Sequence, residues 1–198
     1  MKKLIAVLST MVWSLFFVNA IQAQCSSSGK SNTSKTTIGN TTINPEKDIV
    51  SNIINSKKLS TLVAAVKAAN LVSTLQSDGP FTVFAPTNEA FDRIPAVFKK
   101  ALAKNPAALT DILLYHVAAD KLTATDVLSG NAITTLQGSS IQPFLWREAP
   151  FINDSKIIAT DLMAGNGVVH VIDKVMIPRS IKSDIYRSMI RDYLNSRR

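Results

Sequence analysis

The sequence predicts an α+β domain in which helices come before strands. In the first half, apolar residues recur at helical spacing, as at Leu62, Val63 and Val66. After Asp120 the chain changes to short β-branched segments separated by turns. The last of these, 168–172, is apolar on both of its alternating faces, which is typical of a buried inner strand. Helices followed by strands within 198 residues indicate one α+β domain.

Two helices are predicted at the start of the domain. Asn44 is a suitable capping residue and Pro45 suits a first helical position, so the first helix is expected to begin there. The second extends from about Ser60 to Leu71 and carries an apolar stripe along one side.

One strand and two further helices complete the first half. Residues 77–80 read Ser-Asp-Gly-Pro, a strong turn signal, and the alternating segment 81–85 follows as a strand that Pro86 ends. Thr87 begins a short helix, and Asn105, which a proline follows, begins another.

The second half contains an aromatic segment between its predicted strands, which are 132–136, 140–146, 157–159 and 168–172. Residues 142–150, with Phe144 and Trp146, are expected to form a loop or hairpin that is particular to this chain. Two interpretations of Trp146 stay open. Its ring either stacks on a sugar or a partner protein, or it covers the apolar end of the domain itself, which is the commoner role.

The N-terminus has the organisation of a secretory signal peptide. Lys2 and Lys3 precede an apolar run over 4–18, and cleavage after Ala23 would remove residues 1–23. The run is too short to cross a hydrocarbon core of about 30 Å as a helix. The sequence therefore predicts export, to the cell surface, the periplasm or the extracellular space.

A polar Ser/Thr-rich stretch over 24–42 is predicted to be a flexible linker, because it has too few apolar residues to bury. Cys25 stands directly after the predicted cleavage site, where bacterial lipoproteins are acylated, although Gln24 replaces their usual small residue. A free thiol and an intermolecular disulfide are the alternatives.

The net charge of +8 lies mostly outside the domain. Residues 43–178 carry equal numbers of basic and acidic side chains, so a nucleic-acid-binding face is not expected. The tail, 179–198, reads as a basic amphipathic helix. It either docks its apolar stripe on the domain or offers a basic face to an anionic polymer or a membrane surface.

No catalytic, cofactor or metal site is predicted. Nucleophile elbow, P-loop and zinc-protease motifs are absent, and two histidines with one cysteine are too few for a structural zinc site. His116 and His170 are candidates for an acid or base that works with Tyr115 and Asp173. Each histidine stands within an apolar run, which favours a hydrogen-bonded core role.

Three ordered motifs over about 44–178 resemble those of fasciclin (FAS1) domains. The first is 82–91, the second is the Tyr115-His116 pair, and the third is 166–178 with His170 and Asp173. The segments 134–138 and 152–154 also resemble the middle of the family. In the first motif the matching residues are Thr82, Phe84, Pro86, Thr87, Asn88 and Phe91.

The resemblance implies a FAS1 domain over 43–178, with N-terminal helices packed on a β-wedge. It implies a secreted or surface-attached module for cell adhesion or for matrix or cell-envelope association, without catalysis. The expected partner is a cell-surface or matrix protein or a polysaccharide, and self-association is also permitted. In some animal members the Tyr-His region is implicated in integrin binding, which makes Tyr115 and His116 candidate contacts beside their expected core role. The alternative function is an envelope lipoprotein acylated at Cys25, with a structural or accessory role.

Overall fold

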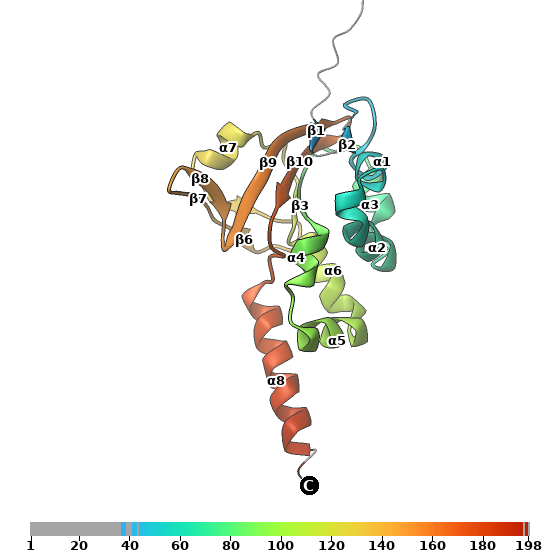
Figure 1. Cartoon of the computed structure of the whole chain (residues 1–198), viewed down its shortest axis with the longest axis vertical. Helices are drawn as coiled ribbons and strands as arrows, with labels where there is room; N and C mark the ends of the chain where they lie inside the picture. Colours follow the sequence, from blue (N-terminus) through green and yellow to red (C-terminus); the bar gives the residue numbers. More distant parts are fainter. Residues whose placement is uncertain (1–36, 39–40, 43, 196, 198) are drawn as a thin grey trace, which may run out of the picture. The chain divides into compact units, whose positions relative to one another are not determined.

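A mixed sheet is the centre of the fold (Figure 1). The computed structural model describes residues 37–38, 41–42, 44–195 and 197, and within these residues six strands form the sheet. In spatial order they are β4 (Val117–Ala118), β3 (Phe81–Pro86), β10 (Gly167–Ile172), β9 (Ser155–Ala164), β8 (Ala149–Ile152) and β7 (Pro143–Trp146). β3 and β10 pair in parallel and the other neighbours are antiparallel.

The inner position predicted for 168–172 is confirmed. β10 lies between β3 and β9, and all of its residues are buried. Two smaller pairs of strands accompany the main sheet: β1 (Thr37–Ile38) with β2 (Thr41–Thr42), and β5 (Ile133–Thr134) with β6 (Ser140–Ile141). The first pair falls inside the segment predicted as a linker. The predicted signal peptide, 1–23, and Cys25 lie outside the described residues.

Helices cover the sheet and extend from it. On one side lie α1 (Ile49–Ile54), α2 (Ser60–Ala68) and α3 (Val72–Gln76), with a short 3-10 turn, η1 (Lys57–Leu59), between the first two (Figure 1). The others are α4 (Asn88–Asp92), α5 (Ala96–Lys104), α6 (Pro106–Leu114), α7 (Ala124–Leu128) and α8 (Arg179–Asn195).

The buried apolar residues form three clusters. The first joins α1, α2 and α3 to β3, β9 and β10, and it includes Ile49, Leu62 and Val169. The second involves Phe84 and the β-rich half, with members from β6, β8 and α7. The third joins α5 and α6 to the beginning of α8. Because the strands β3 and β10 contribute to the first two clusters, both of their faces are buried.

The first helix begins later than the sequence predicts. α1 is capped by Asp48, whose carboxylate accepts a hydrogen bond from the Ser51 amide at 2.9 Å. Asn44 instead forms a turn, in which its side-chain oxygen accepts from the Glu46 amide at 3.0 Å. The buried side chain of Asn52 fixes this turn by bonding the backbone of Asn44 in both directions, at 2.8 Å each. A local Asx turn therefore replaces the expected helical cap.

β10 runs so close to β3 that Gly167, the first residue of β10, has no room for a side chain. Gly167 pairs with Phe81. A Cβ atom on Gly167 would collide with the backbone carbonyl of Phe81 and with the end of the Ile49 side chain. Glycine at this position therefore permits the parallel pairing.

Candidate functional site

The first and third predicted motifs are neighbours in the sheet. β3 carries the first motif and β10 the third, with Phe84 in register with His170. Their rings stack with centroids 5.6 Å apart and an interplanar angle of 21°. Both side chains are fully buried. Motifs separated by nearly half of the chain thus form one packed unit.

His170 is bonded at both ring nitrogens. Its Nδ1 accepts from the Asp161 backbone amide at 3.3 Å, and its Nε2 donates to the Leu122 carbonyl at 2.9 Å. Burial lowers its pKa, so the neutral ring is favoured. Asp173 makes no contact with this ring among the bonds of the described residues. The imidazole therefore joins two backbone segments, as the core interpretation predicts.

His116 has the same kind of environment. Its Nε2 accepts from the Met176 amide at 3.0 Å, which leaves Nδ1 to donate to the Ile112 carbonyl at 2.7 Å. Desolvation lowers its pKa to about 4. Tyr115 points elsewhere: its hydroxyl donates to the Ser140 carbonyl at 3.3 Å and accepts from the Asn153 side chain at 3.0 Å.

These bonds correct one part of the site prediction. Tyr115 and His116 are both buried, so neither presents a surface to a partner in this conformation. No bond described here links either residue to His170 or Asp173. Tyr115, His116, His170 and Asp173 therefore do not form an acid–base set in this structure, and each makes its own structural contacts.

The polar residues of the first motif hold loops and helix ends. The Thr82 hydroxyl donates to the Asp120 carbonyl and accepts from the Leu122 amide at 2.8 Å. Thr87 caps α4 by accepting from the Ala90 amide. Asn88 accepts from the Thr61 amide at 3.0 Å at the start of α2 and donates to the Lys57 carbonyl.

Two apolar members of the same motif complete its packing. Pro86 is the last residue of β3 and is buried, and Phe91 packs against the first core cluster. The matching residues of the first motif are thus used for folding.

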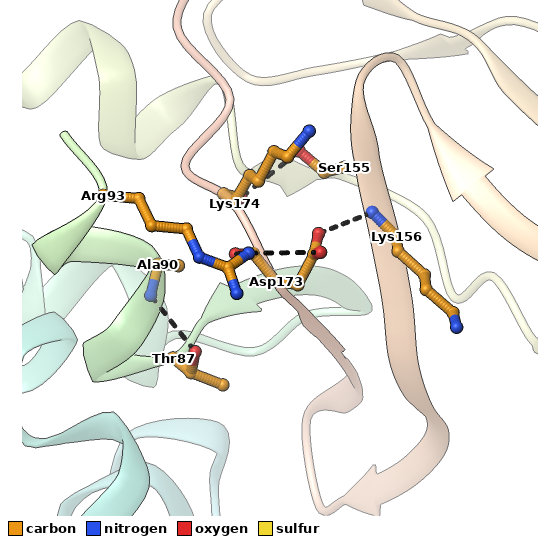
Figure 2. A network of polar contacts seen from close by, with 7 residues as sticks. All are labelled: Thr87, Ala90, Arg93, Ser155, Lys156, Asp173 and Lys174. Atoms are coloured by element: carbon orange, nitrogen blue, oxygen red, sulfur yellow. Dashed lines mark hydrogen bonds and ion pairs between the residues drawn. The ribbon is translucent and has the colours of Figure 1, made fainter.

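Asp173 connects three segments after the end of β10 (Figure 2). One carboxylate oxygen accepts from the Lys156 amide of β9 at 2.7 Å. The other oxygen lies 3.4 Å from the guanidinium of Arg93, the residue that follows α4. The same guanidinium donates to the Asp173 carbonyl. Beside it, the Ser155 hydroxyl donates to the Lys174 carbonyl at 3.3 Å. Asp173 therefore ties β9 to the chain that leaves the sheet.

Replacing Asp173 by alanine is expected to lower the free energy of unfolding by about 1–2 kcal/mol, because the Lys156 amide loses its charged acceptor. The matched control is Arg93→Ala, which removes the exposed partner of the ion pair and its hydrogen bond to the Asp173 carbonyl, leaves the Lys156 bond in place, and should cost less than about 1 kcal/mol. Urea unfolding measures both. Equal losses in the two variants would show that the ion pair, and not the amide bond, carries the contribution.

An exposed aromatic hairpin lies at the edge of the sheet. β7 is the edge strand and pairs with β8, and we call residues 143–152 the aromatic hairpin. Phe144 stacks on Phe151 with ring centroids 5.6 Å apart. Phe144, Leu145 and Trp146 are 42%, 57% and 59% exposed. The expectation that Trp146 covers the apolar end of the domain is therefore wrong, because more than half of the side chain is open to solvent.

The turn of the aromatic hairpin is a tight one. Arg147 and Glu148 connect the strands, with positive φ angles of 48° and 65°. Positive φ at both central residues matches the right-handed twist of a two-residue hairpin, although neither residue is the asparagine or glycine that usually adopts it. The Arg147 guanidinium lies 5.9 Å from the centre of the Trp146 ring. The turn thus places a cation beside the exposed indole.

The described residues contain no group of three His, Cys, Asp or Glu side chains that would hold a metal ion. Within the same residues, no helix combines the length and apolar character needed to cross a membrane.

A mixed sheet covered by helices, with its signature residues used as caps and core contacts, is the α+β fold of a FAS1 domain. The family model for the Fasciclin domain matches residues 57–178, and the chain belongs to this family. The resemblance noted in the sequence is confirmed.

Relatives and a solved structure agree with this assignment. Protein sll1483 of Synechocystis sp. is 45% identical over 132 residues, which cover 66% of this chain and 73% of that protein. Transforming growth factor-beta-induced protein ig-h3 of Sus scrofa is 38% identical over 124 residues, 62% of this chain and 18% of its own length. The fold matches that of a FAS1 domain pair from the insect cell adhesion molecule Fasciclin I, with a TM-score of 0.55 and 16% identity. That match covers 74% of this chain and 59% of the solved chain.

Proposed function

We propose that this protein is an exported adhesion-type module that binds a partner through the aromatic hairpin. Membership of the fasciclin family supports an adhesion or extracellular association role without catalysis. The solved structure with the same fold comes from a cell adhesion molecule. The partner class is a protein or polysaccharide of a cell surface or matrix.

The observation that carries the proposal is the exposure of large apolar side chains on β7, with Phe144 and Trp146 on one face of the strand and Leu145 on the other. Soluble domains seldom leave such side chains together in water unless they form a contact surface. Trp is enriched among residues that dominate binding energy, and its flat face stacks on sugar rings as well as on protein groups. The neighbouring Arg147 supplies a hydrogen-bond donor at the same edge.

The backbone of the hairpin supports the same assignment. Holding Arg147 and Glu148 at positive φ costs folding energy, and backbone strain of this kind clusters at contact sites. The Phe144–Phe151 stack holds the ring that lies on the same face of β7 as Trp146. A rigid aromatic surface loses little entropy when it binds.

Attachment through an acylated Cys25 stays a prediction beside this function. The cysteine follows the apolar run at the N-terminus and precedes a serine-rich stretch. Acylation would keep the module at the envelope, whereas a free or disulfide-linked Cys25 would be compatible with release. The mass of the N-terminal peptide of the exported protein distinguishes a diacylglyceryl cysteine from both alternatives.

Replacing Trp146 by alanine is expected to weaken partner binding by at least roughly tenfold, because the exposed indole is the largest anchor of the hairpin. The full chain and the variant are compared on arrays of purified glycans and matrix proteins. Val97→Ala is the matched control, since Val97 is similarly exposed but lies on α5. Binding that Trp146→Ala leaves unchanged, or that Val97→Ala reduces equally, would contradict the assignment of the hairpin as the contact surface.

A further inference from the structure

The C-terminal helix docks on the domain along one face, from its first turns to Met189. Ile181 and Ile185 are buried in the third core cluster, against Phe98 and Ile112. Tyr186 meets the edge of the Phe98 ring, with centroids 5.4 Å apart. The docking interpretation of the tail is therefore correct for α8 as far as Met189. Another face of the helix is exposed to solvent.

From Tyr186 to Leu194, a row of apolar side chains along α8 faces solvent. Ile190 and Leu194 are 60% and 59% exposed, and Tyr186 and Tyr193 are also exposed. Tyr186, Ile190 and Leu194 follow one another at intervals of four, so they share one helical face. We call this row, with Tyr193, the α8 apolar row.

Basic side chains flank the α8 apolar row. Arg187 and Arg191 each follow a member of the row by one position and are spaced by four themselves, so they form a parallel row beside it. Residues 179–198 contain six basic and two acidic residues. The ion pair between Arg187 and Asp184, at 3.7 Å, joins two largely exposed side chains, so solvent screens it. A strip of exposed apolar groups thus lies next to a strip of positive charge.

We propose that the second half of α8 binds the surface of an anionic lipid membrane. Ile190 and Leu194 would enter the boundary between head groups and acyl chains, while Arg187 and Arg191 would pair with lipid phosphates. Tyrosine suits this position because its ring is amphipathic. The helix has 17 residues and lies on the membrane without spanning it.

The charge of the tail favours this occupant over a second copy of the chain. Pairing two α8 helices through their apolar rows would bring together two segments with the same excess of positive charge. Like charges repel in such an interface, whereas an anionic membrane attracts each nearby basic side chain by about 1 kcal/mol. This inference is independent of the aromatic hairpin and of the partner that it binds.

Co-sedimentation with vesicles tests the proposal. The full chain is mixed with vesicles of phosphatidylcholine alone or of phosphatidylcholine with phosphatidylglycerol, at low and high sodium chloride. We expect binding to the anionic vesicles that salt weakens. The double variants Ile190→Ser with Leu194→Ser, and Arg187→Gln with Arg191→Gln, should each reduce this binding roughly tenfold or more. All of these chains share residues 1–42, so any contribution of that segment is common to them.

Matched controls separate this surface from general charge and hydrophobicity. Lys100→Gln with Lys104→Gln removes two exposed basic residues from α5, and Val97→Ser removes an exposed apolar one. Both should leave most of the binding intact, and circular dichroism confirms that every variant is folded. Equal binding by all variants, or no preference for the anionic vesicles, would overturn the proposal. A dimer seen by sedimentation velocity that Ile190→Ser with Leu194→Ser abolishes, without vesicle binding, would assign the row to self-association instead.

Discussion

Gly167→Ala is expected to destabilise the domain by at least about 3 kcal/mol, and to reduce the yield of folded protein. The added methyl group would collide with the carbonyl of Phe81, which belongs to a buried strand and has no room to move. Relief of the collision requires β10 to shift away from β3, which would disturb the first core cluster. Urea unfolding followed by circular dichroism measures the loss.

Gly165→Ala is the matched control for this prediction. A Cβ atom on Gly165 would lie 3.5 Å from the carbonyl oxygens of residues 45–47, an ordinary van der Waals distance. This substitution is expected to change stability by less than about 1 kcal/mol, and it removes conformational freedom from the unfolded chain. If the two variants unfold at the same urea concentration, close approach of β3 and β10 does not explain the glycine at 167.

Acid is expected to destabilise the protein across the range in which unfolded histidine gains a proton. His116 has a pKa of about 4 in the folded state, against 6.5 for an unperturbed histidine. Between these values the unfolded chain binds a proton that the folded chain does not, so the free energy of unfolding falls as the pH falls. The contribution of neutral His116 to the free energy of unfolding is fully present above pH 6.5. About 3 kcal/mol of this contribution is lost by pH 4. Burial lowers the pKa of His170 as well, which adds to the loss in the same direction.

His116→Gln tests the assignment of this pH dependence. Glutamine cannot titrate, but its side-chain oxygen can accept from the Met176 amide in place of Nε2. The variant is expected to be less stable at neutral pH and to lose less stability on acidification than the natural chain. Urea titrations through the same pH window measure both slopes. Parallel slopes would show that His116 does not control acid unfolding.

The local elements were predictable where a side chain marks their boundary. Thr87 and Asn105 do cap α4 and α6, because their oxygens reach amides three residues ahead. α5 was missed, since Pro95 precedes it and offers no side-chain cap. α7 was also missed, although Thr123 and Asp126 carried a usable signal: the Asp126 carboxylate accepts from the Thr123 amide at 2.8 Å.

The contacts between distant segments were not predictable from local patterns. Apolar residues on both faces of 168–172 indicated an inner strand, but nothing in the sequence specified its parallel pairing with β3. The same limit applies to the candidate site. The sequence marked Trp146 and the Tyr115-His116 pair as candidates, but burial depends on which element packs on each side chain. β7 proved to be an edge strand, whereas Tyr115 lies in the second core cluster.

The parallel pairing of β3 with β10 sets the order in which the chain can fold. β3 emerges early during synthesis, but its neighbour β10 ends only at Ile172. Closing so long a loop costs chain entropy. The contacts between β3 and β10 that offset this cost form only when both strands are present. Until translation has passed β10, the central strand pair of the sheet cannot form. We therefore expect the sheet to assemble late, after nearly the whole domain has been synthesised.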